Sequence, residues 1–472
     1  MSVPSWVQDS VFYQIFPDRF SNGHPENDPR SVVPWNSLPT NMSFHGGDLK
    51  GIIDRFYYLL DLGINAIYLN PIFLSPSNHR YNAIDYFQID PKLGTKVEFL
   101  TLLDLAHRNE MKVILDGVFN HCGRGFFAFN DVLENQADSP YLDWFHIKKF
   151  PVDAFSPGEA TTYEAWWKYK SLPKFNTSNP DVQKYILRVA RYWIEHGIDG
   201  WRLDVPNEID DDDFWFRFRE VVKSANPDAY LLGEIWDGDP RWVGDRHFDG
   251  LMNYPLRTSL INLLSAKVGV KDFIADYKKN QEKYSPDNLL AMYNLLGSHD
   301  TERFLTMVKG DQAAAKLGYF LQFTLCGSPA LFYGDEIGLV GAGDPDCRRA
   351  FEWNESKWNI PLRDWIKNLI RIRQARVSLR RGKIHFIEEL TTDGLLAFTR
   401  KTDHETVLVI ANPALKPVTA ELDLEQLNVG TNGTLRNLLS KEKISVFGTK
   451  TTIHFPARSC FILFPEDSYG QA

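Results

Sequence analysis

The sequence predicts an α/β fold, a (β/α)8 TIM barrel followed by a C-terminal antiparallel β-sandwich. Eight short apolar runs alternate with longer amphipathic stretches, which is typical of parallel strands joined by helical crossovers. Polar or ionisable side chains follow every run, at the strand ends where such barrels carry out their chemistry. After Arg381 the rhythm changes to short alternating strands with turn signals, which indicates the sandwich.

The pattern places the barrel strands at residues 11–17, 64–70, 112–120, 198–205, 230–236, 250–254, 290–297 and 329–334. It places helices at residues 49–62, 97–108, 182–196, 214–224, 313–324 and 362–376. In the first helix the apolar residues form one stripe, Asp48 is a natural N-cap and Gly63 ends the helix. Arginines at the end of the last helix complement its C-terminus, and we expect them to form a solvated face: Arg371, Arg373, Arg376, Arg380 and Arg381.

An irregular insertion after the third strand marks the first domain boundary. Residues 121–180 are rich in aromatic residues, proline and aspartate, and long loops in compact domains usually carry function. We therefore expect a barrel at 1–120 and 181–381, an inserted subdomain B at 121–180 and the sandwich at 382–472. Within the insertion, Trp166, Trp167 and Tyr169 either stack on sugar rings or pack the insertion against the barrel.

Composition narrows the classes of function. The 472 residues are 43% hydrophobic and 24% charged, which suits two or three domains with substantial cores. Lys+Arg 52 against Asp+Glu 61 gives a net charge of −9, so nucleic acid and membrane are not expected partners. Four scattered cysteines indicate free thiols. The start of the chain has no export signal and no apolar run reaches the length of a membrane span, so we expect a cytoplasmic monomer or homodimer.

The strand ends carry the strongest chemical signal. Asp204, Glu234 and Asp300 follow the fourth, fifth and seventh strands, and Arg202 lies two residues before Asp204, where it could hold that carboxylate ionised. Glycoside hydrolysis needs one ionised and one protonated carboxyl group, and the apolar run around Glu234 makes it the candidate for a raised pKa. The alternative, salt bridges or helix caps at the barrel mouth, suits any single acid better than the whole set. The polar residues at these ends are Asp18, Asn70, Asn120, His121, Asp204, Glu234, Asn253, His299, Asp300, Asp335 and Glu336.

Four sequence blocks in order resemble the α-amylase family of glycoside hydrolases over nearly the whole chain. They are Asp-Gly-Val-Phe-Asn-His (116–121), Gly-Trp-Arg-Leu-Asp-Val-Pro-Asn-Glu (200–208), Gly-Glu-Ile-Trp (233–236) and Gly-Ser-His-Asp (297–300). The resemblance implies that Asp204 is the nucleophile, Glu234 the acid/base and Asp300 the transition-state stabiliser. It also places Tyr81, His121, Arg202 and His299 in the first sugar subsite, with Asp116 and Asn120 supporting them.

A fifth block is similar to one subgroup, the neopullulanases, cyclomaltodextrinases and maltogenic amylases. Leu-Pro-Lys-Phe-Asn (172–176) resembles the Met-Pro-Lys-Leu-Asn signature of that subgroup, and Asn207-Glu208 follows the nucleophile as it does there. By this resemblance Glu208 and Trp236 line the leaving-group side. Asp344 and Arg348 match residues that bind the non-reducing side of the substrate, although a salt bridge within the loop explains them equally well.

Members of the subgroup usually carry an extra β-sandwich domain before the barrel. Here the first barrel strand starts at about residue 10, so we expect that domain to be absent and the cleft to be more open. This expectation gives α-1,6 debranching of longer chains more weight.

One group of residues resembles a calcium-binding loop of the subgroup, and its oxygen atoms suit a hard cation. These residues are Asn22, Asn27, Asp28, Gly46 and Asp48. His24 stands where an aspartate is expected, and its nitrogen suits Ca²⁺ poorly. His24 weakens the case for calcium, so a filled site and a simple turn held by Asn and Asp hydrogen bonds are equally open alternatives. No cofactor is expected to be required.

The sequence as a whole predicts a retaining α-glucan hydrolase. Its substrates would be maltooligosaccharides, cyclodextrins, pullulan or branched dextrins, cut at α-1,4 bonds, α-1,6 bonds or both. Two alternatives stay open: an enzyme that mainly transfers glucan chains to other sugars, and a non-catalytic amylase-like binding protein, against which the intact acid set argues.

Overall fold

The computed structural model describes residues 3–391, 394–423, 433–446, 449–465. The chain divides into two compact units. The first consists mainly of Phe12–Met252 and Gly343–Trp353, and the second of Asn253–Ala342 and the chain from Asn354 onward. Among the described residues, no helix combines the length and the apolar character that a membrane crossing requires.

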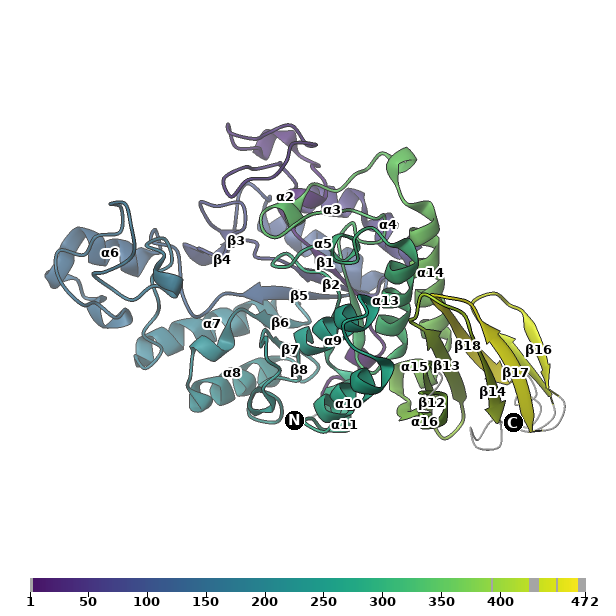
Figure 1. Ribbon diagram of the computed structural model, residues 1–472. Helices are drawn as coiled ribbons and strands as arrows, with labels where there is room; N and C mark the ends of the chain where they lie inside the picture. Colours follow the sequence, from purple (N-terminus) through teal and green to yellow (C-terminus); the bar gives the residue numbers. More distant parts are fainter. Residues whose placement is uncertain (1–2, 392–393, 424–432, 447–448, 466–472) are drawn as a thin grey trace. The chain divides into compact units, whose positions relative to one another are not determined.

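Eight parallel strands lie where the sequence predicts strands, six in the first unit, which Figure 1 labels, and two in the second. In the first unit the order is β8-β7-β6-β5-β2-β1, with parallel register throughout. In the second unit β10 pairs in parallel with β9. All these strands are buried except Lys112 at the start of β5, as expected for a sheet covered by helices on its outer face. The predicted (β/α)8 barrel is confirmed. The strands are β1 (Phe12–Ile15), β2 (Ala66–Leu69), β5 (Lys112–Gly117), β6 (Gly200–Leu203), β7 (Tyr230–Gly233), β8 (Gly250–Leu251), β9 (Tyr293–Leu295) and β10 (Ser328–Phe332).

Helices follow the barrel strands in the expected places. The first predicted helix is in fact two, because Arg55 leaves helical angles (φ −99°, ψ 9°) between them. Asp48 caps the first of these, accepting a hydrogen bond from the Gly51 N–H at 2.6 Å, and Gly63 ends the second with φ 92°. The helices are α1 (Ser5–Gln8), α2 (Pro17–Phe20), α3 (Leu49–Asp54), α4 (Phe56–Leu62), α5 (Lys96–Arg108), α6 (Phe127–Asn135), α7 (Pro180–Glu195), α8 (Asp212–Ala225), α9 (Tyr254–Leu264), α10 (Val270–Gln281), α11 (Pro286–Leu290), α12 (Phe304–Met307), α13 (Gln312–Thr324), α14 (Ile360–Ala375), α15 (Val377–Arg381) and α16 (Glu388–Thr391).

The insertion after β5 contains α6 and short 3-10 turns, joined by isolated bridges such as Phe145 to Phe175. Earlier in the same unit, a two-stranded antiparallel sheet pairs β3 (Phe73–Leu74) with β4 (Asp85–Ile89). Aromatic residues pack edge to face inside the insertion, for example Phe129 against Phe145 and Tyr163. The boundaries expected at residues 120, 181 and 381 stay a prediction.

The C-terminal part of the second unit is an antiparallel sandwich, as predicted. A six-stranded sheet runs in the order β11-β12-β13-β18-β15-β16, and a two-stranded sheet pairs β14 with β17. One apolar cluster joins the two sheets, with Leu408 and Leu463 from the larger sheet and Leu422 and Phe455 from the smaller. The strands are β11 (Lys383–Phe386), β12 (Leu396–Lys401), β13 (Thr406–Asn412), β14 (Val418–Asp423), β15 (Gly433–Asn437), β16 (Lys443–Val446), β17 (Lys450–Phe455) and β18 (Ser459–Pro465).

The arginines at the end of α14 do not form one solvated face, so that prediction was wrong in part. Arg373 is only 1% exposed and donates to the backbone carbonyls of Leu379 and Gly327. Burial lowers the pKa of Arg373 to about 9. Arg380 and Arg381 form ion pairs with Asp9.

Candidate active site

One buried arginine gathers three carboxylates at the carboxyl ends of neighbouring strands. Arg202 on β6 contacts Asp116 Oδ1 at 2.8 Å, Asp204 Oδ1 at 2.9 Å and Glu234 Oε2 at 2.8 Å. The Arg202 side chain is 0% exposed, and the three acids are almost as buried. The parallel register explains the convergence, because it aligns Asp116 with Arg202 and Arg202 with Leu232, two residues before Glu234. Burial alone would lower the pKa of Arg202, but the surrounding acids raise it well above its usual value.

Asp116 anchors this cluster from β5. Its Oδ2 atom accepts hydrogen bonds from the hydroxyl groups of Tyr68 at 2.5 Å and Tyr81 at 2.8 Å. Burial raises the pKa of Asp116, while the Arg202 guanidinium and the two hydroxyl donors oppose that rise. Asn70 donates to the Tyr81 hydroxyl at 3.0 Å and so ties this second layer to β2. The sequence identified Tyr81 and Asn70 but not Tyr68, although Tyr68 is two residues before Asn70 and so points the same way.

Glu234 is held from three sides. Besides Arg202, it accepts hydrogen bonds from the Val205 N–H at 3.0 Å and from Trp236 Nε1 at 3.1 Å. Val205 adopts a left-handed conformation (φ 35°, ψ 50°), which is rare for a β-branched residue and costs conformational energy. Sequence reasoning missed this strained position, because no glycine stands there to mark it. The raised pKa that the sequence suggests for Glu234 stays a prediction.

His121 and the inserted tryptophans form a stack beside the cluster. The His121 ring stacks on Trp166 with centroids 5.5 Å apart, and Trp166 stacks on Trp167 at 4.8 Å. Trp167 is 72% exposed and Tyr169 is exposed too, which favours stacking on sugar rings over packing for these two residues. Burial lowers the pKa of His121 to about 3, which keeps the ring neutral. Among the described residues its Nε2 atom has no hydrogen-bond partner, as expected of a group that meets a ligand hydroxyl.

The remaining predicted residues lie in smaller groups. In the second unit, His299 Nε2 is 3.0 Å from Asp300 Oδ2, and the Asp300 side chain is 29% exposed. In the first unit, Lys174 of the fifth sequence block lies 3.6 Å from the Glu208 carboxylate, so two parts of the subgroup signature touch.

Asp344 and Arg348 form a salt bridge at 2.9 Å within their own loop. This is the alternative that the sequence left open for the pair. The Asp344 side chain is 43% exposed and that of Arg348 is 10% exposed.

The predicted calcium loop is compact. Asn22 Nδ2 donates to both Asp28 oxygens, and a Cβ at Gly46 would lie 2.3 Å from Asp28 Oδ1. Asp48 instead accepts backbone N–H groups, including that of Gly23 at 3.1 Å. Burial raises the pKa of both aspartates.

Two buried amide oxygens in this loop have no hydrogen-bond partner among the described residues, Asn22 Oδ1 and Asn27 Oδ1. No group of three or more His, Cys, Asp or Glu residues suited to a metal occurs in the described part of the chain, so a cation here would depend on amide oxygens. The His24 ring is 3.1 Å from Glu98 Oε1, and its nitrogen is engaged there. The donors that remain are all oxygen atoms, which fit a hard cation.

Comparisons with known proteins agree with this geometry. The model of the α-amylase catalytic domain matches residues 14–368, and that of the maltogenic amylase C-terminal domain matches residues 384–462. A cyclomaltodextrinase from Bacillus sp. is 44% identical over 87% of this chain and 73% of its own length.

Two solved structures match almost end to end. Cyclic α-maltosyl-(1→6)-maltose hydrolase from Arthrobacter globiformis, in complex with cyclic α-maltosyl-(1→6)-maltose, is 39% identical, with a TM-score of 0.89 over 98% of this chain and 100% of that one. The acarbose-soaked debranching enzyme of Nostoc punctiforme is 38% identical, with a TM-score of 0.87 and the same coverage. The chain therefore belongs to the α-amylase family of glycoside hydrolases, in the subgroup of cyclomaltodextrinases, neopullulanases and maltogenic amylases.

Proposed function

We propose that this enzyme hydrolyses α-glucosidic bonds with retention of configuration, with Asp204 as nucleophile and Glu234 as acid/base. The observation that carries the proposal is the shared guanidinium of Arg202, which forms ion pairs with both carboxylates at 2.9 and 2.8 Å. The Arg202 guanidinium is the planar group that lies between the Asp204 and Glu234 carboxylates. Such an arrangement suits the distance of about 5 to 5.5 Å between the two carboxyl groups of retaining enzymes.

In the proposed reaction the Asp204 carboxylate attacks the anomeric carbon while Glu234 donates a proton to the departing glycosidic oxygen. The C1–O bond breaks as the glycosyl–Asp204 ester forms. Glu234, now ionised, takes a proton from water, whose oxygen attacks the same carbon and releases Asp204. Arg202 orients Asp204 and favours its ionised form. Asp300, His299, His121 and Tyr81 are assigned to the sugar ring that distorts in the transition state.

The proposed substrates are α-glucans that contain α-1,6 as well as α-1,4 bonds. The support comes from the two solved relatives that this chain matches over at least 98% of both chains, a cyclic maltosyl-(1→6)-maltose hydrolase and a debranching enzyme. On this proposal Glu208 and Trp236 contact the leaving group, and Asp344 and Arg348 contact the non-reducing side. Transfer to a sugar acceptor uses the same intermediate and is the second outcome to be measured.

Product analysis tests this proposal. The purified protein is incubated separately with β-cyclodextrin, with pullulan and with a maltooligosaccharide that carries a long α-1,6 branch. We expect release of the intact linear branch as the dominant reaction, and no turnover by Glu234→Gln. Cyclodextrin opening as the fast reaction, or panose from pullulan, would contradict the preference for α-1,6 bonds. Unchanged turnover by Glu234→Gln would contradict the assigned acid.

We also propose that Asn22, Asn27, Asp28 and Gly46 hold a calcium ion that stabilises the loop, with Asp48 fixing the turn beneath it. The two unpartnered amide oxygens and the Asp28 carboxylate support this. Addition of CaCl2 to chelator-treated protein should raise Tm, and Asp28→Asn should remove the rise. The same Tm with chelator and with calcium would instead support the hydrogen-bonded turn.

A cytoplasmic location is part of the proposal as well. All four cysteines are free thiols, and Cys122, Cys326 and Cys347 are buried, which suits a reducing compartment. A monomer or a homodimer, and the three predicted domains, remain our working description.

A further inference from the structure

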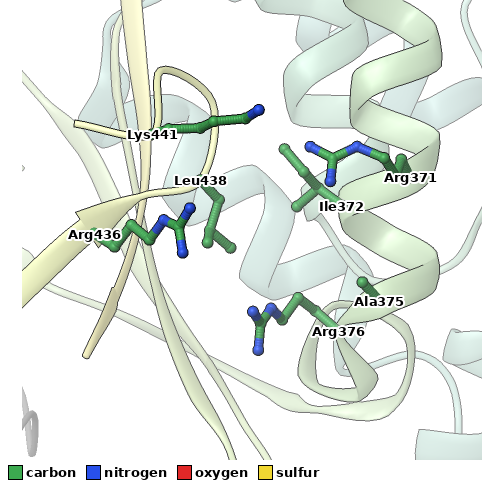
Figure 2. A pocket seen from close by; sticks show the side chains of 7 residues that line it. All are labelled: Arg371, Ile372, Ala375, Arg376, Arg436, Leu438 and Lys441. Atoms are coloured by element: carbon green, nitrogen blue, oxygen red, sulfur yellow. The ribbon is translucent and has the colours of Figure 1, made fainter. Parts of the chain in front are cut away.

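Exposed aromatic side chains gather on the insertion after β5. A sugar ring packs on a flat aromatic face, whereas the small pocket beside α14 in the second unit (Figure 2) is lined by arginine, lysine and aliphatic side chains and offers no such face. In the described part of the chain, exposed aromatic side chains occur at Tyr57, Trp236 and, within the insertion, Phe127, Phe150, Phe155, Trp167 and Tyr169. Single exposed apolar residues are ordinary, but a gathering of them on one short segment indicates a binding surface.

A stack of rings leads from the candidate active site to this surface. His121 stacks on Trp166 with centroids 5.5 Å apart, and Trp166 stacks on Trp167 at 4.8 Å with an angle of 9° between the ring planes. The Tyr169 ring lies 6.3 Å from that of Trp166. Trp167 is 72% exposed and Tyr169 is 55% exposed, so the outer end of the stack faces solvent. The exposed rings are therefore continuous with a residue assigned to the sugar.

The turn that carries Trp167 is strained and firmly held. Trp167 (φ 46°, ψ 28°) and Lys168 (φ 62°) both adopt left-handed backbone angles, which are uncommon for residues other than glycine. The Lys168 N–H donates to the Ala165 carbonyl at 3.0 Å, and the Lys168 carbonyl accepts a hydrogen bond from the Ala160 N–H at 2.8 Å. Internal packing does not explain the strain, because most of the Trp167 side chain is exposed. Strain of this kind is typical of ligand-binding sites, where it presents a side chain to the ligand.

A second turn of the insertion brings Phe155 to the same surface. The Lys170 side chain is only 9% exposed, and its Nζ atom donates to Asp153 Oδ2 at 2.7 Å. Because Lys170 directly follows Tyr169, this contact ties the turn that contains Phe155 to the strained turn. The Arg124 guanidinium lies over the Phe155 ring at 4.6 Å, which orients the ring while 71% of the residue stays exposed.

We propose that Phe155, Trp167 and Tyr169 form a surface that binds a segment of an α-glucan chain outside the catalytic cluster. This proposal rests on the proposed function, because it concerns the chain to which the cleaved bond belongs. A glucosyl ring has apolar faces that pack on aromatic rings and hydroxyl groups that stay in water, so oriented and exposed rings suit it. A chain that reaches from the cluster to this surface makes both contacts at once and binds more tightly than a short chain.

Native gel electrophoresis with and without amylopectin measures the binding of a glucan chain independently of turnover. Amylopectin should retard the full-length protein, and Phe155→Ser and Tyr169→Ser should each raise the apparent Kd about threefold or more. Phe155→Tyr should keep the native Kd, because it keeps the aromatic face. Tyr57→Ser is the matched control, since it removes an aromatic side chain that is 79% exposed but belongs to α4 rather than to the insertion.

Kinetics with two lengths of substrate separate this surface from the catalytic cluster. Phe155→Ser should lower kcat/KM for a maltooligosaccharide with a long α-1,6 branch, and leave Tm and kcat/KM for one with a maltosyl branch unchanged. If the native protein cleaves neither substrate, the proposed function fails, while the gels still decide whether the surface binds a glucan.

Four results would overturn the proposed surface. The first two are a native protein that amylopectin does not retard, and Phe155→Ser and Tyr169→Ser variants that keep the native Kd. The third is an equal fall of kcat/KM for both branch lengths, which would place Phe155 in the catalytic cleft. The fourth is a native dimer in sedimentation velocity that Phe155→Ser dissociates, which would make the surface an interface between two copies of the chain.

Discussion

Replacement of Arg202 by lysine tests whether one guanidinium organises the site. The native side chain forms ion pairs with three buried carboxylates at 2.8 to 2.9 Å. Lysine keeps the charge but lacks the planar fork, so it leaves at least one of the three acids without its partner. Breaking a buried ion pair costs about 3 to 5 kcal/mol, and we expect the low end of that range because the charge remains. Since Asp204 loses its orientation as well, kcat/KM should fall by about 100-fold or more.

Urea unfolding and the kinetics of release of an α-1,6-linked maltooligosaccharide branch measure the two effects of Arg202→Lys. Arg219→Lys is a matched control, because Arg219 forms a similarly buried pair with Asp249 at 2.9 Å outside the site. Lys223 also bonds Asp249, so the control should lose less stability and keep its kcat/KM. If Arg202→Lys keeps kcat/KM within threefold of the wild type, the reasoning is refuted.

Three further predictions concern the surroundings of the cluster. Val205→Gly should raise the free energy of unfolding by about 1 kcal/mol by relieving the left-handed strain. The same variant should lower kcat several-fold, because the backbone N–H that holds Glu234 becomes less well fixed. A fall in the free energy of unfolding would contradict the proposed strain at Val205. His121 has a folded pKa of about 3 against 6.5 when unfolded, so its contribution to stability is lost as pH falls below 6.5. In His121→Asn the pH slope of the unfolding free energy from pH 6.5 to 4 should be flatter by up to about 1.4 kcal/mol per pH unit, and an unchanged slope in urea titrations would refute the assignment. Trp167→Ala should raise KM for long maltooligosaccharides a few-fold at unchanged Tm, whereas a drop in Tm with constant KM would indicate a packing role.

The sequence predicted the barrel because its signals are local. Apolar runs fix the strands, and side chains such as Asp48 and Gly63 mark helix ends through their own chemistry. The break at Arg55 left no such mark, and the buried Arg373 looked like a surface charge. Only the fold brings backbone carbonyls around that guanidinium, so composition could not reveal its burial.

The site also contains residues that local sequence signals reveal and residues that only the fold brings into place. Their positions at strand ends identified Arg202, Asp204 and Glu234. In a parallel sheet the carboxyl ends of neighbouring strands lie side by side, so residues at those ends meet. The Tyr68 hydroxyl on Asp116 and the strained Val205 depend on side-chain reach and on backbone angles, which no spacing encodes.

The central claim is that Asp204 forms a covalent bond to the sugar while Glu234 completes the turnover. Its most direct test is mass spectrometry of Glu234→Gln after incubation with a 5-fluoro-α-glucosyl fluoride, whose good leaving group needs no acid. We predict a single glycosyl adduct on the peptide that carries Asp204, and none in Asp204→Asn. An adduct on the Asp300 peptide, or no adduct while free sugar is released with inverted configuration, would contradict the account.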